Sequence, residues 1–121
     1  MTKHILVVED HEDNRRILRD LLGSVGYAMS EASDGEAALA AVKAQRPDLI
    51  LMDIQLPLLD GYEVTRRIKS DPDFKDIPII VVSSYALSGD EPKARAVGCD
   101  AYVTKPYSPR DLLRRIREFL K

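Results

Sequence analysis

Acidic side chains follow two apolar segments of this sequence, and a hydroxyl group and an amine follow two others. Glu9 and Asp10 come directly after the first apolar run, and Asp53 ends the third. Ser83 follows the fourth run and Lys105 the fifth. Three carboxylates brought together would repel one another, and a hard divalent cation such as Mg²⁺ would relieve that repulsion. An amine and a hydroxyl opposite them suit an anionic group such as a phosphoryl oxygen.

Asp53 is the most unusual of these residues because it ends an apolar segment. An ionised carboxylate is costly there unless it is paired or lies next to a metal. Beside Mg²⁺ it can attack phosphorus and form an aspartyl phosphate, with Lys105 holding a second oxygen. Each residue alone also fits a plain structural role, Glu9 or Asp10 as a helix cap and Lys105 as a surface lysine. Their occurrence after four separate segments favours one shared site.

The intervening sequence predicts five strands that alternate with five helices. The expected strands cover residues 5–8, 27–32, 49–53, 79–82 and 101–104, and the expected helices lie near 17–25, 34–46, 63–70, 91–97 and 109–120. Strands that are apolar throughout are buried on both faces, which indicates a parallel sheet covered by helices on each side. Right-handed crossovers then give a doubly wound α/β sandwich. The carboxyl ends of its strands share one edge, where ligands bind.

Local signals predict where these helices begin and which face they bury. Ile17 belongs to an apolar stripe typical of one helix face. Ser33 and Glu36 have the spacing of a capping box. Ser108 and Pro109 have the residue types that begin a helix.

Composition restricts the class of protein without indicating any chemistry. The 121 residues carry 20 acidic and 18 basic side chains, a formal net charge of −2, which predicts one domain over residues 1–121 and argues against direct nucleic-acid or membrane binding. The single cysteine, Cys99, has no internal disulfide partner and fits a reducing, cytoplasmic location. The first apolar run is too short for a signal peptide or a membrane span. His4 and His11 lack metal-ligand spacing and are assigned no chemistry.

Together these motifs resemble the receiver domains of response regulators over essentially the whole chain. The resemblance is carried by residues 7–10, 51–57, 60–61, 82–84 and 103–106. It implies a flavodoxin-like (βα)5 three-layer fold with five parallel strands in the order 2-1-3-4-5. It also implies a signalling switch of two-component systems rather than an enzyme. Asp53 would accept a phosphoryl group from a sensor histidine kinase or a histidine phosphotransfer protein in a Mg²⁺-dependent reaction.

The resemblance also implies a set of metal ligands. Asp10 and Asp53 would bind Mg²⁺ through their side chains, and Gln55 would do so through its backbone carbonyl. Glu9 would contribute directly or through water, and its longer side chain departs from the more frequent Asp.

Further roles follow from the same resemblance. Lys105 would contact a phosphoryl oxygen, and its bond to Pro106 would be cis. Ser83 would move to hydrogen-bond the phosphoryl group, and Tyr102 would swing inward behind it. Ser84 stands where Ala is most usual in the family.

The resemblance also implies an output partner, and three alternative functions are considered beside it. An output partner would bind the surface of the fourth helix, fifth strand and fifth helix, and the chain would be a free-standing regulator, monomeric or weakly dimeric on phosphorylation. One alternative is a Mg²⁺-dependent phosphohydrolase with an Asp nucleophile, against which Gln55 breaks the usual Asp-x-Asp pair. Another is a receiver that signals without phosphate. A flavodoxin-type cofactor site is disfavoured because residues 9–13 are acidic where a phosphate would lie.

Overall fold

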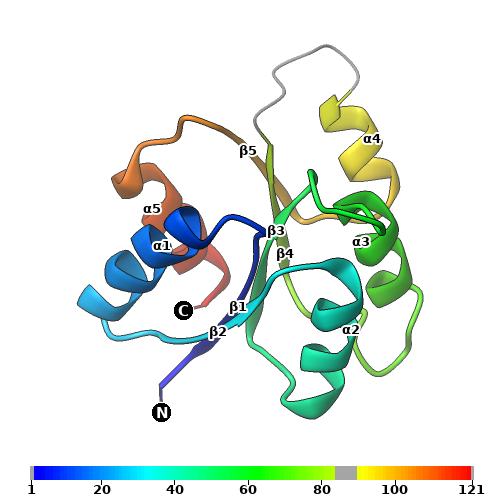
Figure 1. Cartoon of the computed structure of the whole chain (residues 1–121), viewed down its shortest axis with the longest axis horizontal. Helices are drawn as coiled ribbons and strands as arrows, with labels where there is room; N and C mark the ends of the chain where they lie inside the picture. Colours follow the sequence, from blue (N-terminus) through cyan, green and yellow to red (C-terminus); the bar gives the residue numbers. More distant parts are fainter. Residues whose placement is uncertain (1, 84–89, 121) are drawn as a thin grey trace.

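The computed structural model describes residues 2–83 and 90–120, and five strands alternate with five helices within them (Figure 1). The strands are β1 (His4–Val8), β2 (Ala28–Ala32), β3 (Leu49–Asp53), β4 (Ile79–Ser83) and β5 (Ala101–Thr104). The helices are α1 (Glu12–Ser24), α2 (Gly35–Ala44), α3 (Gly61–Lys69), α4 (Asp90–Ala96) and α5 (Pro109–Phe119). Ser84 lies outside the described residues.

All strand pairs are parallel, and the sheet order is β2-β1-β3-β4-β5. Figure 1 shows α1 and α5 on one face of the sheet and α2, α3 and α4 on the other. This arrangement confirms the doubly wound, flavodoxin-like three-layer fold. None of the described helices combines the length and apolar character that a membrane crossing requires.

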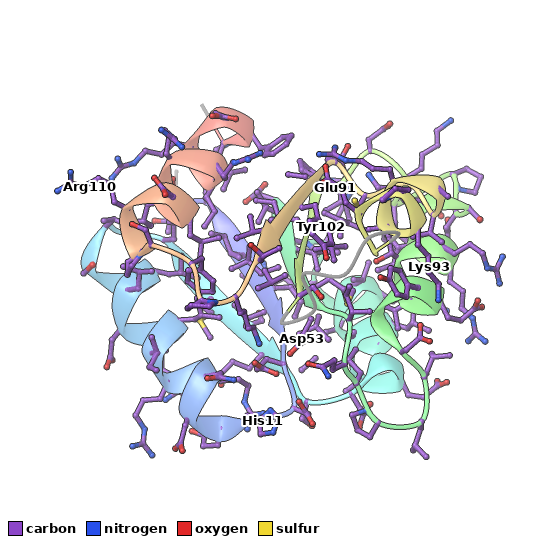
Figure 2. The ribbon with its side chains drawn as sticks, turned by 90° about the horizontal axis from the view of Figure 1, so that it is seen from above. His11, Asp53, Glu91, Lys93, Tyr102 and Arg110 are labelled. Atoms are coloured by element: carbon purple, nitrogen blue, oxygen red, sulfur yellow. The ribbon has the colours of Figure 1, made fainter. Side chains whose placement is uncertain are left out.

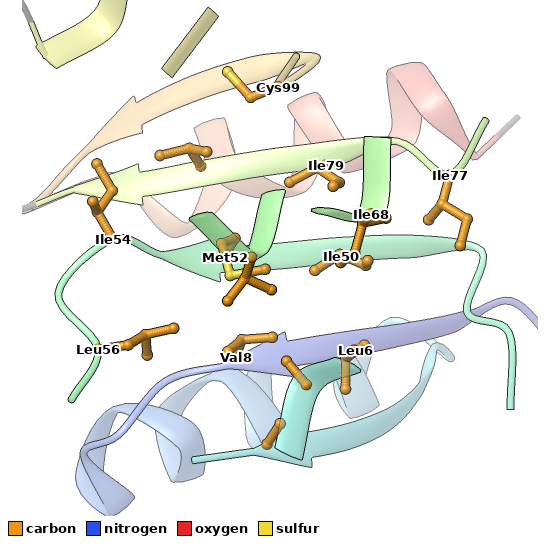
Figure 3. Close-up of a cluster of buried hydrophobic side chains, with 14 of the residues drawn as sticks. Leu6, Val8, Ile50, Met52, Ile54, Leu56, Ile68, Ile77, Ile79 and Cys99 are labelled. Atoms are coloured by element: carbon orange, nitrogen blue, oxygen red, sulfur yellow. The ribbon is translucent and has the colours of Figure 1, made fainter. Parts of the chain in front are cut away.

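Successive residues of the central strands supply two separate hydrophobic cores. Leu6, Ile50 and Ile79 point into the core beneath α2 and α3, part of which Figure 3 shows. Their neighbours Leu51 and Ile80 point into the core beneath α1 and α5. Both sets are buried, which explains why these strands are apolar at every position rather than at alternate ones.

One helix cap agrees with the sequence signals, whereas another cap and the burial of Ile17 differ from them. Ser108 caps α5 by accepting a hydrogen bond from the Asp111 backbone N–H, as expected. The expected capping box at Ser33 is wrong by one residue, because Asp34 caps α2 and accepts from Ala37 at 2.7 Å. Ile17 is 59% exposed although it belongs to the apolar stripe of α1. It lines the mouth of a cavity between α1 and α5 instead of entering the core.

Candidate functional site

The carboxyl ends of β1 and β3 bring two acidic side chains into the interior. Asp53 is the last residue of β3 and is 5% exposed, and Glu9, which follows β1, is 3% exposed. Asp10 lies next to them and is half-buried. Figure 2 looks onto this edge of the sheet, with Asp53 between His11 and Tyr102. The parallel topology thus gathers at one edge residues that are more than 40 positions apart in the chain.

Lys105 joins the two buried carboxylates. Its Nζ donates hydrogen bonds to Glu9 Oε1 at 3.0 Å and to Asp53 Oδ2 at 3.1 Å. The lysine follows β5, its backbone N–H donates to the Ser83 carbonyl oxygen at 2.6 Å, and its bond to Pro106 is cis. The position of the amine is therefore tied to the ends of β4 and β5.

The loop that follows β3 orients the Asp53 carboxylate. The backbone N–H of Gln55 donates to Asp53 Oδ1 at 2.9 Å. Gly61 begins α3 directly against this strand end, where an added Cβ would lie 2.3 Å from the Asp53 carbonyl oxygen. Only glycine allows the helix to approach so closely.

Burial and the neighbouring groups shift the pKa values of Asp53 and Glu9 in opposite directions. Burial raises the pKa of Asp53 from 3.8 to about 6, and the carboxylate of Glu9 acts in the same direction. Burial also opposes ionisation of Glu9, but hydrogen bonds with Asp53, Lys105 and Asn14 outweigh it and lower the pKa of Glu9 to about 2. The pKa of Lys105 is raised, because the attraction of both carboxylates exceeds the effect of burial.

Two carboxylate oxygens at this edge remain available to a ligand. Glu9 Oε2 and Asp10 Oδ1 are buried and accept no hydrogen bond from the residues that the structure describes. One ligand atom each from Glu9, Asp10 and His11 lies within 4.8 Å of the others, and Asp53 adjoins this group through Glu9. Hard oxygen donors with excess negative charge fit a divalent cation such as Mg²⁺.

The remaining residues predicted for the site lie around Asp53. Ser83 is fully buried at the end of β4, and its backbone is paired with Thr104 of β5. Tyr102 is 9% exposed and already packs within the core beneath α2 and α3. The inward movement expected of Tyr102 therefore starts from a buried side chain.

His11, which was assigned no chemistry from the sequence, also lies at this edge of the sheet. Its Nδ1 lies 3.0 Å from Asp10 Oδ1 and 3.7 Å from Glu9 Oε2. The spacing between His4 and His11 does not reveal this contact, because His11 lies close to Glu9 and Asp10, which precede it in the sequence.

A cavity of about 460 Å³ opens beside the carboxylates, between the sheet, α1 and α5. Its walls are mainly apolar, and its polar end consists of Glu9, Asp53, Asn14 and Lys105. Asp53 therefore lines this cavity although its carboxylate is buried.

Comparison with known proteins gives the same family across the chain. The model of the response regulator receiver domain matches residues 5–117. The polar-differentiation response regulator DivK of Brucella ovis is 42% identical over 120 residues, which cover 99% of this chain and 98% of that protein.

Two solved structures are similar over nearly their whole length. The receiver domain of a Pseudomonas aeruginosa PAO1 sensor histidine kinase, with a magnesium ion coordinated in its active site cleft, has 35% identity and a TM-score of 0.91 and covers 99% of this chain and 98% of its own. The phosphorylated cyanobacterial phytochrome response regulator RcpA has 32% identity and a TM-score of 0.85, and the match covers 98% of this chain and 91% of RcpA. With this sheet order and this acidic edge, the chain belongs to the family of response regulator receiver domains, the signalling switches of two-component systems.

Proposed function

We propose that Asp53 is the phosphoacceptor of this receiver and that the domain occupies residues 1–121. The single observation that carries the proposal is the buried Asp53 carboxylate at a strand end, hydrogen-bonded by Lys105 and by the Gln55 backbone. Because the chain is a receiver, its phosphodonor is a histidine kinase or the phosphotransfer protein that such a kinase loads. The family assignment also removes the phosphohydrolase alternative.

In the transfer step, an Asp53 carboxylate oxygen attacks the phosphorus of a phosphohistidine. The new P–O bond forms as the P–N bond breaks, and the departing imidazole nitrogen retains the electron pair and takes up a proton from water. Lys105 is placed to hold one phosphoryl oxygen, since its Nζ already lies 3.1 Å from Asp53 Oδ2. Ser83 would donate its hydroxyl to a second oxygen after phosphorylation.

We propose Glu9, Asp10, Asp53 and the Gln55 carbonyl as the residues that hold Mg²⁺. The unsatisfied oxygens of Glu9 and Asp10 support this ligand set, as does the magnesium ion in the cleft of the similar Pseudomonas aeruginosa receiver. When bound, the cation offsets the negative charge that builds up during transfer. Without such compensation, Asp53 and Glu9 hold their charges at close range, and among the described residues Lys105 is the cation hydrogen-bonded to both.

We infer that the output surface consists of α4, β5 and α5. Support comes from the connection between Lys105 and the ends of β4 and β5, and from Tyr102, which lies opposite Val81 in the sheet. A change at Asp53 is thereby transmitted to β5. We expect a cytoplasmic protein whose affinity for an output partner follows its phosphorylation.

The test is phosphorylation by acetyl phosphate with Mg²⁺, followed on a phosphate-affinity gel. We expect the wild type to gain one hydroxylamine-sensitive phosphoryl group and Asp53→Asn to gain none. Asp20→Asn removes an exposed carboxylate from α1 and is the matched control, expected to react like the wild type. An unmodified wild type would favour the alternative of a receiver that signals without phosphate, and equal labelling of Asp53→Asn would place the acceptor elsewhere.

A further inference from the structure

His11 occupies the capping position of α1 but does not cap the helix. Its backbone is extended, with φ −90° and ψ 121°, and its side chain makes no capping hydrogen bond. Short polar side chains such as Ser, Asp or Asn normally fill this position because they bond to the free N–H groups of the first turn. The imidazole instead turns its Nδ1 toward Asp10.

The contact between His11 and Asp10 is close, yet it is not a hydrogen bond. Nδ1 lies 3.0 Å from Asp10 Oδ1, but this oxygen accepts no hydrogen bond from the described residues. The two atoms therefore lie close together without a hydrogen bond between them. Two atoms that bind the same cation have this relationship, because each directs its lone pair at the metal and not at the other ligand.

The separation between His11 and Asp10 fits adjacent ligands of an octahedral cation. Ligands at about 2.1 Å from a metal lie about 3.0 Å apart in adjacent positions and about 4.2 Å apart in opposite ones. The Nδ1 atom of His11 is 3.0 Å from Asp10 Oδ1 and 3.7 Å from Glu9 Oε2. The first distance matches adjacent ligands, and the second lies between the two values, so Glu9 Oε2 has to shift for the three atoms to share one ion.

A second observation points to a cation independently of the histidine. The side chain of Glu9 is only 4% exposed, and its Oε2 has no hydrogen-bond partner among the residues in the structure. A buried carboxylate oxygen in that condition is costly unless a ligand satisfies it. Lys105 satisfies only the other oxygen, Oε1.

We propose that Nδ1 of His11 is an additional ligand of the divalent cation, beside Asp10 and Glu9. The inference rests on the proposed function, since the cation is the one that assists phosphorylation of Asp53. An imidazole nitrogen suits Mn²⁺, Co²⁺, Ni²⁺ and Zn²⁺ better than Mg²⁺, which prefers oxygen. This site should therefore favour transition-metal ions over Mg²⁺ more strongly than a site built from oxygen ligands alone.

The experiment uses Mn²⁺ as the probe and detects the ligand directly. The wild-type chain with bound Mn²⁺ should give a nitrogen modulation in electron spin echo spectra, and replacing ¹⁴N by ¹⁵N in histidine alone should change it. The chain has two histidines. His11→Asn should abolish the signal, and His4→Gln, at the far end of β1, should retain it.

Affinity supplies a second measurement on the same samples. Competition titrations should show the preference for Mn²⁺ over Mg²⁺ falling about tenfold in His11→Asn, the size of loss typical when a group supporting a metal is removed. An unchanged preference, or wild-type spectra insensitive to histidine labelling, would overturn the proposal.

Phosphorylation separates this inference from the proposed function. If acetyl phosphate and Mg²⁺ label Asp53 while no histidine coupling is found, the ligand assignment fails and the proposed function stands. Histidine coupling in a protein that accepts no phosphoryl group would uphold the ligand and overturn the proposed function.

Discussion

Asp53→Asn should make the metal-free protein more stable at neutral pH, although it removes the central residue of the site. Asp53 is 5% exposed, and burial raises its pKa from 3.8 to about 6, with a further contribution from the Glu9 carboxylate. The unfolded chain ionises the same group near its ordinary value. The fold therefore disfavours the charged form, which asparagine cannot adopt.

The size of the expected gain in stability follows from the difference between the two pKa values of Asp53. At about 1.4 kcal/mol per pH unit, the range from 3.8 to about 6 corresponds to about 3 kcal/mol. The amide oxygen of asparagine can still accept from the Gln55 N–H, but the attraction to Lys105 is reduced, so we expect a net gain of about 1–2 kcal/mol.

The pH dependence has a definite sign. Because the folded-state pKa is the higher one, the folded wild type binds more protons than the unfolded chain between about pH 4 and pH 6. The wild type therefore loses stability as the pH rises through that window, while the variant does not titrate at this position. Its advantage should be largest above about pH 6 and should disappear near pH 4.

Urea unfolding monitored by circular dichroism in EDTA, between pH 4.5 and pH 8, measures this difference. Asp20→Asn, in an exposed part of α1, should stay within about 0.5 kcal/mol of the wild type throughout. Added Mg²⁺ should reduce the advantage of Asp53→Asn, because the wild type binds the ion more strongly. A variant less stable than the wild type at pH 7.5 in EDTA, or a difference that is independent of pH, would refute the reasoning.

Two other substitutions test the surroundings of Asp53, and a further pair tests the packing of the core. Gly61→Ala places a Cβ 2.3 Å from the Asp53 carbonyl oxygen and should cost about 1–3 kcal/mol in urea unfolding while slowing phosphorylation; equal rates would show that α3 shifts freely. Lys105→Met leaves two buried carboxylates without their amine and should lower the free energy of unfolding by about 3 kcal/mol at pH 7.5. The loss should be smaller below pH 6, where Asp53 takes up a proton, and a loss independent of pH would contradict the ion pair. Labelling by acetyl phosphate should slow on the order of 100-fold. Ile50→Ala should cost about 2–5 kcal/mol, whereas Ile17→Ala should change stability by about 0.5 kcal/mol or less; similar losses would contradict the exposure of Ile17.

The fold could be predicted because its strands are buried on both faces. Runs such as Leu49–Met52 carry no alternation that would permit a solvated face, and this restricts the sheet to a parallel one between helical layers. Ile17 was misjudged because periodicity identifies a helix face but not where the neighbouring helix leaves a cavity open. The cap at α2 was misplaced because Ser33 and Asp34 are both good capping residues, and the sequence alone does not choose between neighbours.

The site was predictable to the extent that it depends on topology. Strand ends of a parallel sheet meet at one edge, so the proximity of Glu9, Asp53 and Lys105 follows from the order of the elements. The orientation of His11 does not follow, because a capping residue can turn either to the helix or to the preceding loop. In the structure, Nδ1 of His11 lies near the buried Glu9 and the half-buried Asp10.

The charge distribution explains how a single phosphoryl group can act as a switch here. Lys105 now divides its amine between Glu9 and Asp53, and its backbone N–H holds the Ser83 carbonyl. Phosphorylation of Asp53 would replace one carboxylate charge by a phosphoryl charge of about −1.5 to −2 near neutral pH, so we expect the amine to be drawn away from Glu9 toward the new oxygens. The backbone of Lys105 is bonded to β4 and follows β5 directly, so we expect movement of its side chain to act on both strands together. Tyr102 lies opposite Val81 in that strand pair, and we therefore expect β5 to be the first element on the proposed output surface to respond.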